Sequence, residues 1–260
     1  MKIEFAKYQG TGNDFVILDN RQGMYSGLTK EQVSFICNRH FGIGADGLMM
    51  LQLKDGFDFE MVYYNADGAL GSMCGNGGRC LTAFAKKMGI ISTSAHFIAT
   101  DGEHKATIDK QDTIELQMKN VEQIEKDNGH YILNTGSPHY IYFTKDVNAE
   151  DVYQKGRTIR YSEKFGKAGI NINFVQLNPD KSIHVRTYER GVENETLSCG
   201  TGVTASAIAA NADSAELQQI TVHTPGGTLL VKFKPKGNGV FEDVWLCGPA
   251  KPVFEGIIKL

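Results

Sequence analysis

The chain has 260 residues, enough for one large domain or two modest ones. Hydrophobic residues make up 41% and charged residues 22%, values typical of a folded globular protein and not of a disordered or fibrous one. The net charge of −3, the scattered basic residues and the lack of a long apolar run argue against nucleic-acid and membrane partners, so we expect a cytoplasmic protein.

Two residue types carry further information. Glycine is unusually frequent, with 29 residues, which indicates close approach of the backbone to another group. The five cysteines are an odd number without a Cys-x-x-Cys pair, so neither a disulfide framework nor a paired-thiol zinc site is expected. A functional cysteine would therefore act as a reduced thiol. We expect Cys37, Cys80 and Cys247 to be core residues.

In chain order, the first half begins with a turn at Thr11-Gly12 and a helical stretch over residues 30–38. The segment Gly-Ile-Gly-Ala-Asp-Gly at 42–47 fits a dinucleotide-binding fingerprint, which requires a strand before it and a helix after it. Here the helix comes first and the strand, residues 48–53, follows. Nucleotide-dependent chemistry is therefore not expected. No metal-binding spacing of histidines is present, so no metal is expected either.

The chain then shows an internal repeat. A strand over residues 57–64 precedes Met-Cys-Gly-Asn-Gly-Gly-Arg at 73–79, and a strand over 183–188 precedes Ser-Cys-Gly-Thr-Gly at 198–202. Three landmarks recur after 124 or 125 residues: the glycine turns at Gly12 and Gly136, the cysteines Cys74 and Cys199, and the turns at Thr100 and Thr224. The two strands before the cysteines follow the same order and form a fourth landmark.

The repeat predicts two homologous halves, residues 1–118 and 119–249. Each half contains short strands, one central helix after the cysteine, and further strands with glycine-containing turns. We therefore predict an α+β fold with mostly antiparallel sheets. The second central helix, predicted over residues 203–212, is alanine-rich and nearly uncharged, which indicates a helix buried on all sides by a surrounding sheet.

The two repeated cysteines are the candidate chemical groups. A thiol directly before a helix lies near unpaired backbone N–H groups and the positive end of the helix dipole, which both stabilise a thiolate. The neighbouring glycines at 75, 77, 200 and 202 would let the same backbone approach a carboxylate. Either cysteine alone would be read as a small buried hydrophobe. The duplicated context favours catalytic thiols.

Two such thiols facing each other across one cleft would suit inversion at a carbon atom. Racemisation of an α-carbon needs a base on one face and an acid on the other, with a carboxylate held to accept developing negative charge. Paired helix N-termini would supply that hold without a cofactor.

Five segments together resemble the diaminopimelate epimerase family, over nearly the whole chain: 10–15 (Gly-Thr-Gly-Asn-Asp-Phe), 65–68 (Asn-Ala-Asp-Gly), 73–79, 188–191 (Tyr-Glu-Arg-Gly) and 198–202. The resemblance implies a cofactor-independent enzyme that converts LL-diaminopimelate to the meso form in lysine and peptidoglycan precursor synthesis. It also implies pseudo-symmetric halves with the active site in the cleft between them, a C-terminal tail (250–260) returning to the first half, and a homodimer.

The resemblance further implies roles for individual residues. Cys74 and Cys199 would be the acid and the base. The expected substrate contacts are Asn13, Asn65, Gly75, Asn76, Asn171, Glu189, Arg190, Gly200 and Thr201. His139, together with Glu189, would tune the thiols. The chain departs from the family pattern at Ser137, where an asparagine is frequent, and at Gly47, where some members have glutamine.

Two other functions remain open from the residues. One is a racemase of a different amino acid on the same scaffold, such as the proline racemase group. The other is an amino-acid-binding or redox-sensing protein that uses Cys74 and Cys199 as a reversible disulfide. The asparagines and Arg190 favour a long substrate with a second charged end.

Overall fold

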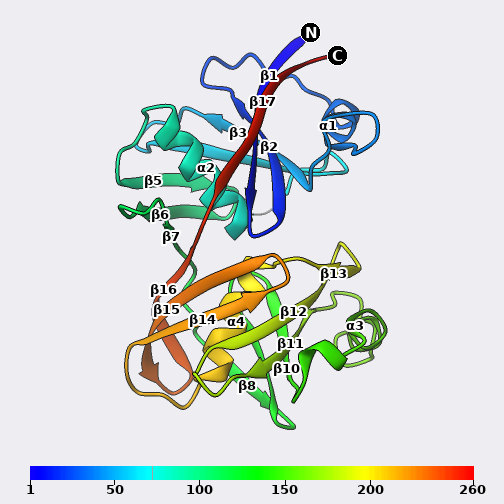
Figure 1. The fold of residues 1–260 in the computed structure, drawn as a ribbon, viewed down its shortest axis with the longest axis vertical. Coiled ribbons are helices and arrows are strands. Elements are labelled where there is room, and N and C mark those ends of the chain that lie inside the picture. The colour runs from blue at the N-terminus through cyan, green and yellow to red at the C-terminus, as the bar shows by residue number, and fades with distance from the viewer. Residues whose placement is uncertain (72) are drawn as a thin grey trace. The chain divides into compact units, whose positions relative to one another are not determined.

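The computed structural model describes residues 1–71 and 73–260. It divides into two compact units, both drawn in Figure 1. Unit 1 consists of Met1–Leu116 and Gly248–Leu260, and unit 2 of Gln117–Cys247.

Unit 1 contains a mixed sheet and two helices. The strands pair in the order β17-β1-β2-β3-β4-β5-β6-β7, with β2–β3 and β4–β5 parallel and the other pairs antiparallel. The elements are β1 (Lys2–Gly10), β2 (Asn13–Asp19), α1 (Lys30–Cys37), β3 (Gly47–Gln52), β4 (Phe59–Asn65), α2 (Gly75–Lys87), β5 (Ser94–Ala99), β6 (Gly102–Ile108), β7 (Ile114–Gln117) and β17 (Lys251–Lys259).

Unit 2 repeats this arrangement. Its strands pair in the order β8-β9-β10-β11-β12-β14-β15-β16, with β10–β11 and β12–β14 parallel and β13 beside β12. The elements are β8 (Ile124–Asp127), β9 (His130–Asn134), β10 (Pro138–Phe143), η1 (Val147–Ala149), α3 (Val152–Arg160), β11 (Asn171–Leu177), β12 (Ile183–Glu189), β13 (Asn194–Thr196), α4 (Gly200–Ala210), β14 (Gln218–Thr224), β15 (Gly227–Gly237) and β16 (Val240–Gly248).

The helices occupy the connections between parallel strands. Antiparallel neighbours can be joined by a tight turn, whereas a parallel pair needs a long crossover. In unit 1, α1 connects β2 to β3 and α2 connects β4 to β5; in unit 2, α3 and α4 occupy the corresponding connections. The predicted α+β fold with two repeated halves is therefore confirmed.

The strand registers preserve the sequence repeat. In unit 1 Phe15 lies opposite Gly47 in the parallel β2–β3 pair, and in unit 2 His139 lies opposite Asn171 in the β10–β11 pair. Likewise the antiparallel pair Met49–Tyr63 corresponds to Asn173–Thr187. Each unit 2 residue follows its unit 1 counterpart by 124 positions.

Alternation along the strands separates the two faces of each sheet. In unit 1, Val16 and Leu18 pack in the core beneath Val33 of α1. Phe15, the residue before Val16 in β2, therefore points to the opposite face of the sheet. In unit 2, Tyr140 and Ile172 belong to the core beneath α3. Their neighbours along the strands therefore face α4.

The central helix α4 is buried on nearly all sides, as its composition predicts. Every residue except Thr201 and Ala210 is buried. The helix begins at Gly200 and not at the expected residue 203, and it ends at Ala210 and not at 212. Glycine disfavours helix interiors, which is why its first turn was not predicted as helical.

The ends of the chain lie together in unit 1 (Figure 1). Strand β17 pairs antiparallel with β1, and Lys2 lies opposite Lys259. The backbone N–H of Leu260 donates to the carbonyl of Met1 at 2.9 Å. Among the described residues, no helix combines the length and the apolar composition that a membrane crossing requires.

Gly156 on α3 provides a test of helix–sheet packing. A Cβ at this position would lie 2.4 Å from the Cβ of Tyr188 on β12, so Gly156→Ala should lower the free energy of unfolding by about 1–2 kcal/mol despite the better helix propensity of alanine. Urea denaturation measures this change. Gly27→Ala is the matched control, because a Cβ there meets no atom within 4 Å; it should change stability by less than about 0.5 kcal/mol. Equal stability of the two variants would contradict the packing argument.

Candidate functional site

Cys74 and Cys199 occupy the same position in their units, as N-caps of α2 and α4. Their backbone angles are nearly equal, with φ −111° and ψ 121° at Cys74 and φ −113° and ψ 111° at Cys199. Each carbonyl accepts the first hydrogen bond of its helix, from Gly78 at 2.7 Å and from Val203 at 2.8 Å. Both sulfurs therefore lie at the positive end of a helix dipole.

In unit 1, Cys74 lies beside the β1–β2 turn. Its Sγ is 3.6 Å from Oδ1 of Asn13, and Nδ2 of Asn76 lies 3.3 Å from the same oxygen. The structure thus brings three of the predicted site residues together. An amide oxygen can only accept, so Asn13 accepts hydrogen bonds from both neighbours.

The orientation of the Asn13 amide is set by Asp46. The Nδ2 group of Asn13 donates to Oδ2 of Asp46 at 2.6 Å, which directs Oδ1 toward Cys74. Asp46 in turn pairs with Arg39, and Asp14 pairs with both Arg39 and Lys7 at 2.7 Å. Hydrogen bonds from Arg39 and Lys7 outweigh the desolvation by burial and lower the pKa of Asp14 to about 2.

Arg79, on the first turns of α2, sets the orientation of Asn76. Its Nη2 donates to Oδ1 of Asn76 at 3.0 Å and to Oγ1 of Thr11 at 3.2 Å. A guanidinium group can only donate, so the Asn76 oxygen faces Arg79 and its Nδ2 faces Asn13. Arg79 is fully buried and was not predicted as a site residue.

In unit 2, Cys199 lies beside Thr201 and His139. The Sγ of Cys199 is 3.5 Å from Oγ1 of Thr201, and that hydroxyl is 2.9 Å from Nε2 of His139. His139 is fully buried. Desolvation, with the positive charge of Arg190 as a second cause, lowers the pKa of His139 to about 3. The imidazole is therefore neutral at physiological pH.

Behind His139 lies a buried asparagine that the sequence analysis missed. Nδ2 of Asn173 is 3.0 Å from Nδ1 of His139, and Oδ1 of Asn173 accepts from Oγ1 of Thr187 at 3.0 Å. Polar residues on the face of a buried strand are a sequence signal for such a network, but only the strand register shows that these three are neighbours.

A second cluster in unit 2 joins Asn171, Ser137 and Arg190. Nδ2 of Asn171 donates to Oγ of Ser137 at 2.9 Å, and Oδ1 accepts from the backbone N–H of Arg190 at 2.9 Å. Nη2 of Arg190 lies 3.4 Å from the same serine hydroxyl. Glu189 accepts from Oγ1 of Thr196 at 2.9 Å. The short Ser137 side chain thus contacts two of the predicted substrate-binding residues.

The second glycine of each cysteine motif has a structural purpose that the sequence interpretation did not foresee. A Cβ at Gly202 would lie 2.2 Å from Oδ1 of Asn173, and one at Gly77 would lie 3.0 Å from Sδ of Met49. These glycines make room for strand side chains, and their expected role in the approach of a ligand stays a prediction. Gly75 and Gly200, at the first helical position, are also buried.

Asn65 and Gly47 lie at the same edge of the unit 1 sheet, opposite each other in the β3–β4 pair. Asn65 is the last residue of β4 and is exposed. A Cβ at Gly47 would lie 2.5 Å from the ring of Tyr63, so any larger residue there requires Tyr63 to move. The position of the Tyr63 ring therefore requires a glycine at residue 47.

The remaining cysteines behave as core residues. Burial raises the pKa of both Cys37 and Cys80 to about 12, so neither forms a thiolate at neutral pH. Cys247 is also buried. Within residues 1–71 and 73–260, no group of three or more His, Cys, Asp or Glu side chains could hold a metal ion.

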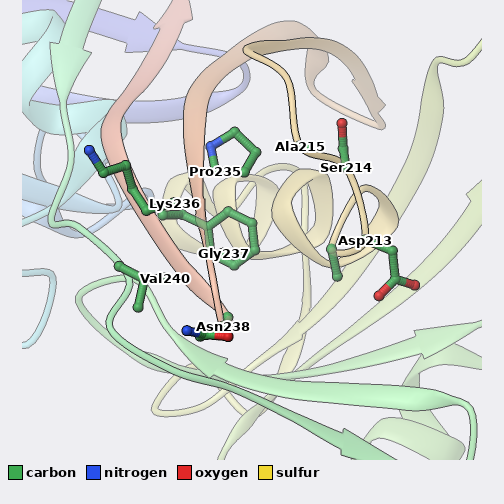
Figure 2. Close-up of a pocket in the computed structure, with 11 residues that line it drawn as sticks. Asp213, Ser214, Ala215, Pro235, Lys236, Gly237, Asn238 and Val240 are labelled. Atoms are coloured by element: carbon green, nitrogen blue, oxygen red, sulfur yellow. The ribbon is translucent and has the colours of Figure 1, made fainter.

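A separate hollow of about 780 Å³ lies in unit 2, beyond the C-terminal end of α4. Figure 2 shows Asp213 and Ser214 on one side of it and Lys236 and Asn238 on the other. Asp213 pairs with Lys126 at 3.2 Å and Lys236 pairs with Glu242 at 3.3 Å, so both charges are compensated. The hollow contains neither candidate cysteine.

The buried His139 makes stability depend on pH. Its folded-state pKa of about 3 lies below the ordinary value of 6.5, so its contribution is present above pH 6.5 and is lost as the pH falls toward 3. Below pH 6.5, the loss of stability of the wild type relative to His139→Gln should steepen and approach about 1.4 kcal/mol per pH unit near pH 5, measured by urea unfolding. From pH 7 to 8 the two curves should be parallel. Parallel curves below pH 6.5 would show that His139 is not buried in its neutral form.

The chain is similar to known proteins over nearly its whole length. The family model for diaminopimelate epimerase matches residues 5–124 and 131–251. A protein named diaminopimelate epimerase from Flavobacterium psychrophilum is 51% identical, covering 98% of this chain and 100% of the relative. Another of the same name from Chlorobaculum tepidum is 39% identical, covering 96% and 99%.

Solved structures share the fold at low sequence identity. A PhzF-family phenazine biosynthesis protein from Bacillus anthracis has a TM-score of 0.78 at 16% identity, with full coverage of both chains. A hydroxyproline epimerase from Agrobacterium vitis has a TM-score of 0.73 at 13% identity, covering 99% of this chain and 91% of the other. Because the family model and the full-length relatives agree, the chain belongs to the diaminopimelate epimerase family and is an isomerase.

Proposed function

We propose that this epimerase converts LL-diaminopimelate to the meso form, with Cys74 and Cys199 as the acid and the base, in lysine and peptidoglycan precursor synthesis. The observation that carries the proposal is the equivalence of the two cysteines. Each is the N-cap of a central helix with the same backbone conformation. The substrate is taken from the names of the full-length relatives.

The proposed reaction moves one proton off the α-carbon and another onto it. A thiolate removes the α-proton from one face and becomes a thiol. The thiol on the opposite face then donates its proton to the carbanion and becomes a thiolate, so charge and atoms balance. This requires the two cysteines to face each other across a cleft between the halves, which is part of the proposal.

The α-carboxylate would be bound by the helix N-termini. The N–H groups of the first turns, at Gly75, Asn76, Gly200 and Thr201, would donate to its oxygens and stabilise the charge that develops when the proton leaves. In this proposal the helix N-termini stabilise the negative charge of the carbanion without a cofactor.

The unit 2 cluster would bind the remaining polar groups of the substrate. Arg190 offers a planar donor fork suited to a carboxylate, and Asn171, held against Ser137 and the Arg190 backbone, offers an amide beside it. Glu189 would accept from the substrate amino group, and Asn13 and Asn65 would add contacts from unit 1. His139 and Glu189 would tune the thiols.

The expected setting is a homodimer in the cytoplasm, where thiols remain reduced. Strand β17 carries Val253, Phe254 and Ile257 with about half of each side chain exposed. Exposed apolar side chains gathered on one element are typical of protein interfaces, which supports the homodimer. Light scattering of the purified protein measures its mass in solution.

The experiment is a proton-exchange assay. The purified, reduced protein is incubated with LL-diaminopimelate in deuterium oxide, and the α-proton signal is followed by NMR. We expect loss of the signal together with appearance of the meso isomer. Cys74→Ala and Cys199→Ala should each lower turnover by at least about 10³-fold, because each removes one of the two proton-transfer groups.

Cys37→Ala is the matched control, since this buried thiol is not ionised at neutral pH, and it should remain active. A fully active Cys74→Ala or Cys199→Ala variant would refute the two-thiol mechanism. Faster exchange with an amino acid carrying one carboxylate, such as proline, would move the function to another racemase. Ligand binding without exchange would favour the binding or redox function.

A further inference from the structure

The two half-sites present different hydrogen-bonding groups to their cysteines. Cys74 faces Oδ1 of Asn13, which is an acceptor because Asp46 holds the amide nitrogen on its other side. Cys199 faces a hydroxyl group, that of Thr201, which can donate or accept. The direction of the Thr201 hydroxyl proton therefore decides whether Cys199 faces a hydrogen-bond donor or an acceptor.

That direction follows from Asn173. Its Nδ2 lies 3.4 Å from the carbonyl oxygen of Tyr140, which only accepts, and its Oδ1 accepts from Thr187. Reversing the amide would place two oxygens against each other at Tyr140. The group that faces Nδ1 of His139 at 3.0 Å is therefore a donor.

The orientation of the Asn173 amide fixes the tautomer of His139, and that tautomer fixes the group that faces Thr201. Since Nδ1 of His139 accepts, the single proton of the neutral ring lies on Nε2, which donates to Oγ1 of Thr201 at 2.9 Å. The Thr201 hydroxyl, having accepted, can direct its own proton to Sγ of Cys199, 3.5 Å away. A donor at this distance stabilises a thiolate, and an acceptor stabilises a thiol.

Unit 1 lacks this relay. The positions equivalent to His139, Asn173 and Thr187 are Phe15, Met49 and Tyr63, which pair in the same strand registers. Phe15 and Met49 are fully buried. Neither Phe15 nor Met49 carries a side-chain N–H or O–H group, so these two positions cannot form the histidine–asparagine relay of unit 2.

We propose that Asn173 and Thr187 are positioning residues that fix His139 in the Nε2–H form and turn the Thr201 hydroxyl toward Cys199, so that Cys199 is the thiolate and Cys74 the thiol in the free enzyme. The assignment rests on the proposed function, in which these two cysteines exchange protons with the substrate. It adds which of them begins as the base.

The test measures each thiol in the free, full-length, reduced protein. With cysteine labelled by ¹³C at Cβ, NMR titration gives the ionisation midpoint of each thiol, and Cys→Ala variants assign the signals. We expect the Cys199 midpoint to lie at least about one pH unit below that of Cys74, a tenfold difference in the ratio of thiolate to thiol. Equal midpoints, or the reverse order, would overturn the inference.

Variants then test the relay. Thr201→Val removes the hydroxyl at nearly constant shape and should raise the Cys199 midpoint by about one pH unit, whereas Thr201→Ser should retain the wild-type value. Thr204→Val is the matched control, because it removes a buried hydroxyl of the same helix that bonds only to the helix carbonyl of Gly200 in the contacts described. It should leave both midpoints unchanged.

The role of Asn173 has its own signature. In ¹⁵N spectra of the wild type, Nδ1 of His139 should have the shift of an unprotonated nitrogen and should show a scalar coupling to Nδ2 of Asn173 across the hydrogen bond. Asn173→Leu should abolish the coupling and raise the Cys199 midpoint, with Cys74 unchanged. A protonated Nδ1 in the wild type would refute the relay even if no variant folds.

These readouts do not involve the substrate. An enzyme that exchanges the α-proton of diaminopimelate but shows equal thiol midpoints would retain the proposed function and lose only this inference. A protein with unequal midpoints but no exchange would lose the proposed function, while the asymmetry of the free thiols would remain.

Discussion

The arrangement of each half depends on its parallel strand pairs. A parallel pair needs a crossover, and the crossover helix that follows β4 or β12 must begin beyond the carboxyl end of that strand. The cysteine therefore enters at the sheet edge where the neighbouring strands begin. Asn13 begins β2, and Asn171 begins β11. Strand connectivity alone thus places these polar residues at the same edge of the sheet as the helix N-terminus, whatever contacts they make there.

The repeat and the central helices could be predicted from the sequence, because they depend on local signals. Cys-Gly-x-Gly recurs after 125 residues, and the strand registers keep the spacing of the repeat to within one residue. Burial of α4 followed from its alanine-rich composition. The proximity of Cys74 to Asn13 and of Cys199 to Thr201 agrees with the motifs. Their roles in binding and proton transfer remain proposals.

The polar networks behind the cysteines could not be predicted, because they depend on contacts between strands. Asn173 is one of three polar residues in β11, with Asn171 and Gln176, and nothing local distinguishes it from a turn-forming asparagine. Its importance follows from the register that places it opposite Thr187 and from the face it shares with His139. Asp46 likewise orients Asn13 across 33 residues of sequence. Such pairings require the assembled sheet.

The strand positions equivalent to His139, Asn173 and Thr187 show how the two halves diverged after duplication. Phe15, Met49 and the half-buried Tyr63 hold the strand positions that His139, Asn173 and Thr187 hold in the other unit, so duplication was followed by divergence at these positions. An aromatic ring in place of His139 would remove the acceptor that Nδ2 of Asn173 faces at 3.0 Å, inside a buried network. The two halves are therefore no longer interchangeable modules, and a recombinant chain built from two copies of either half would not reproduce the parent.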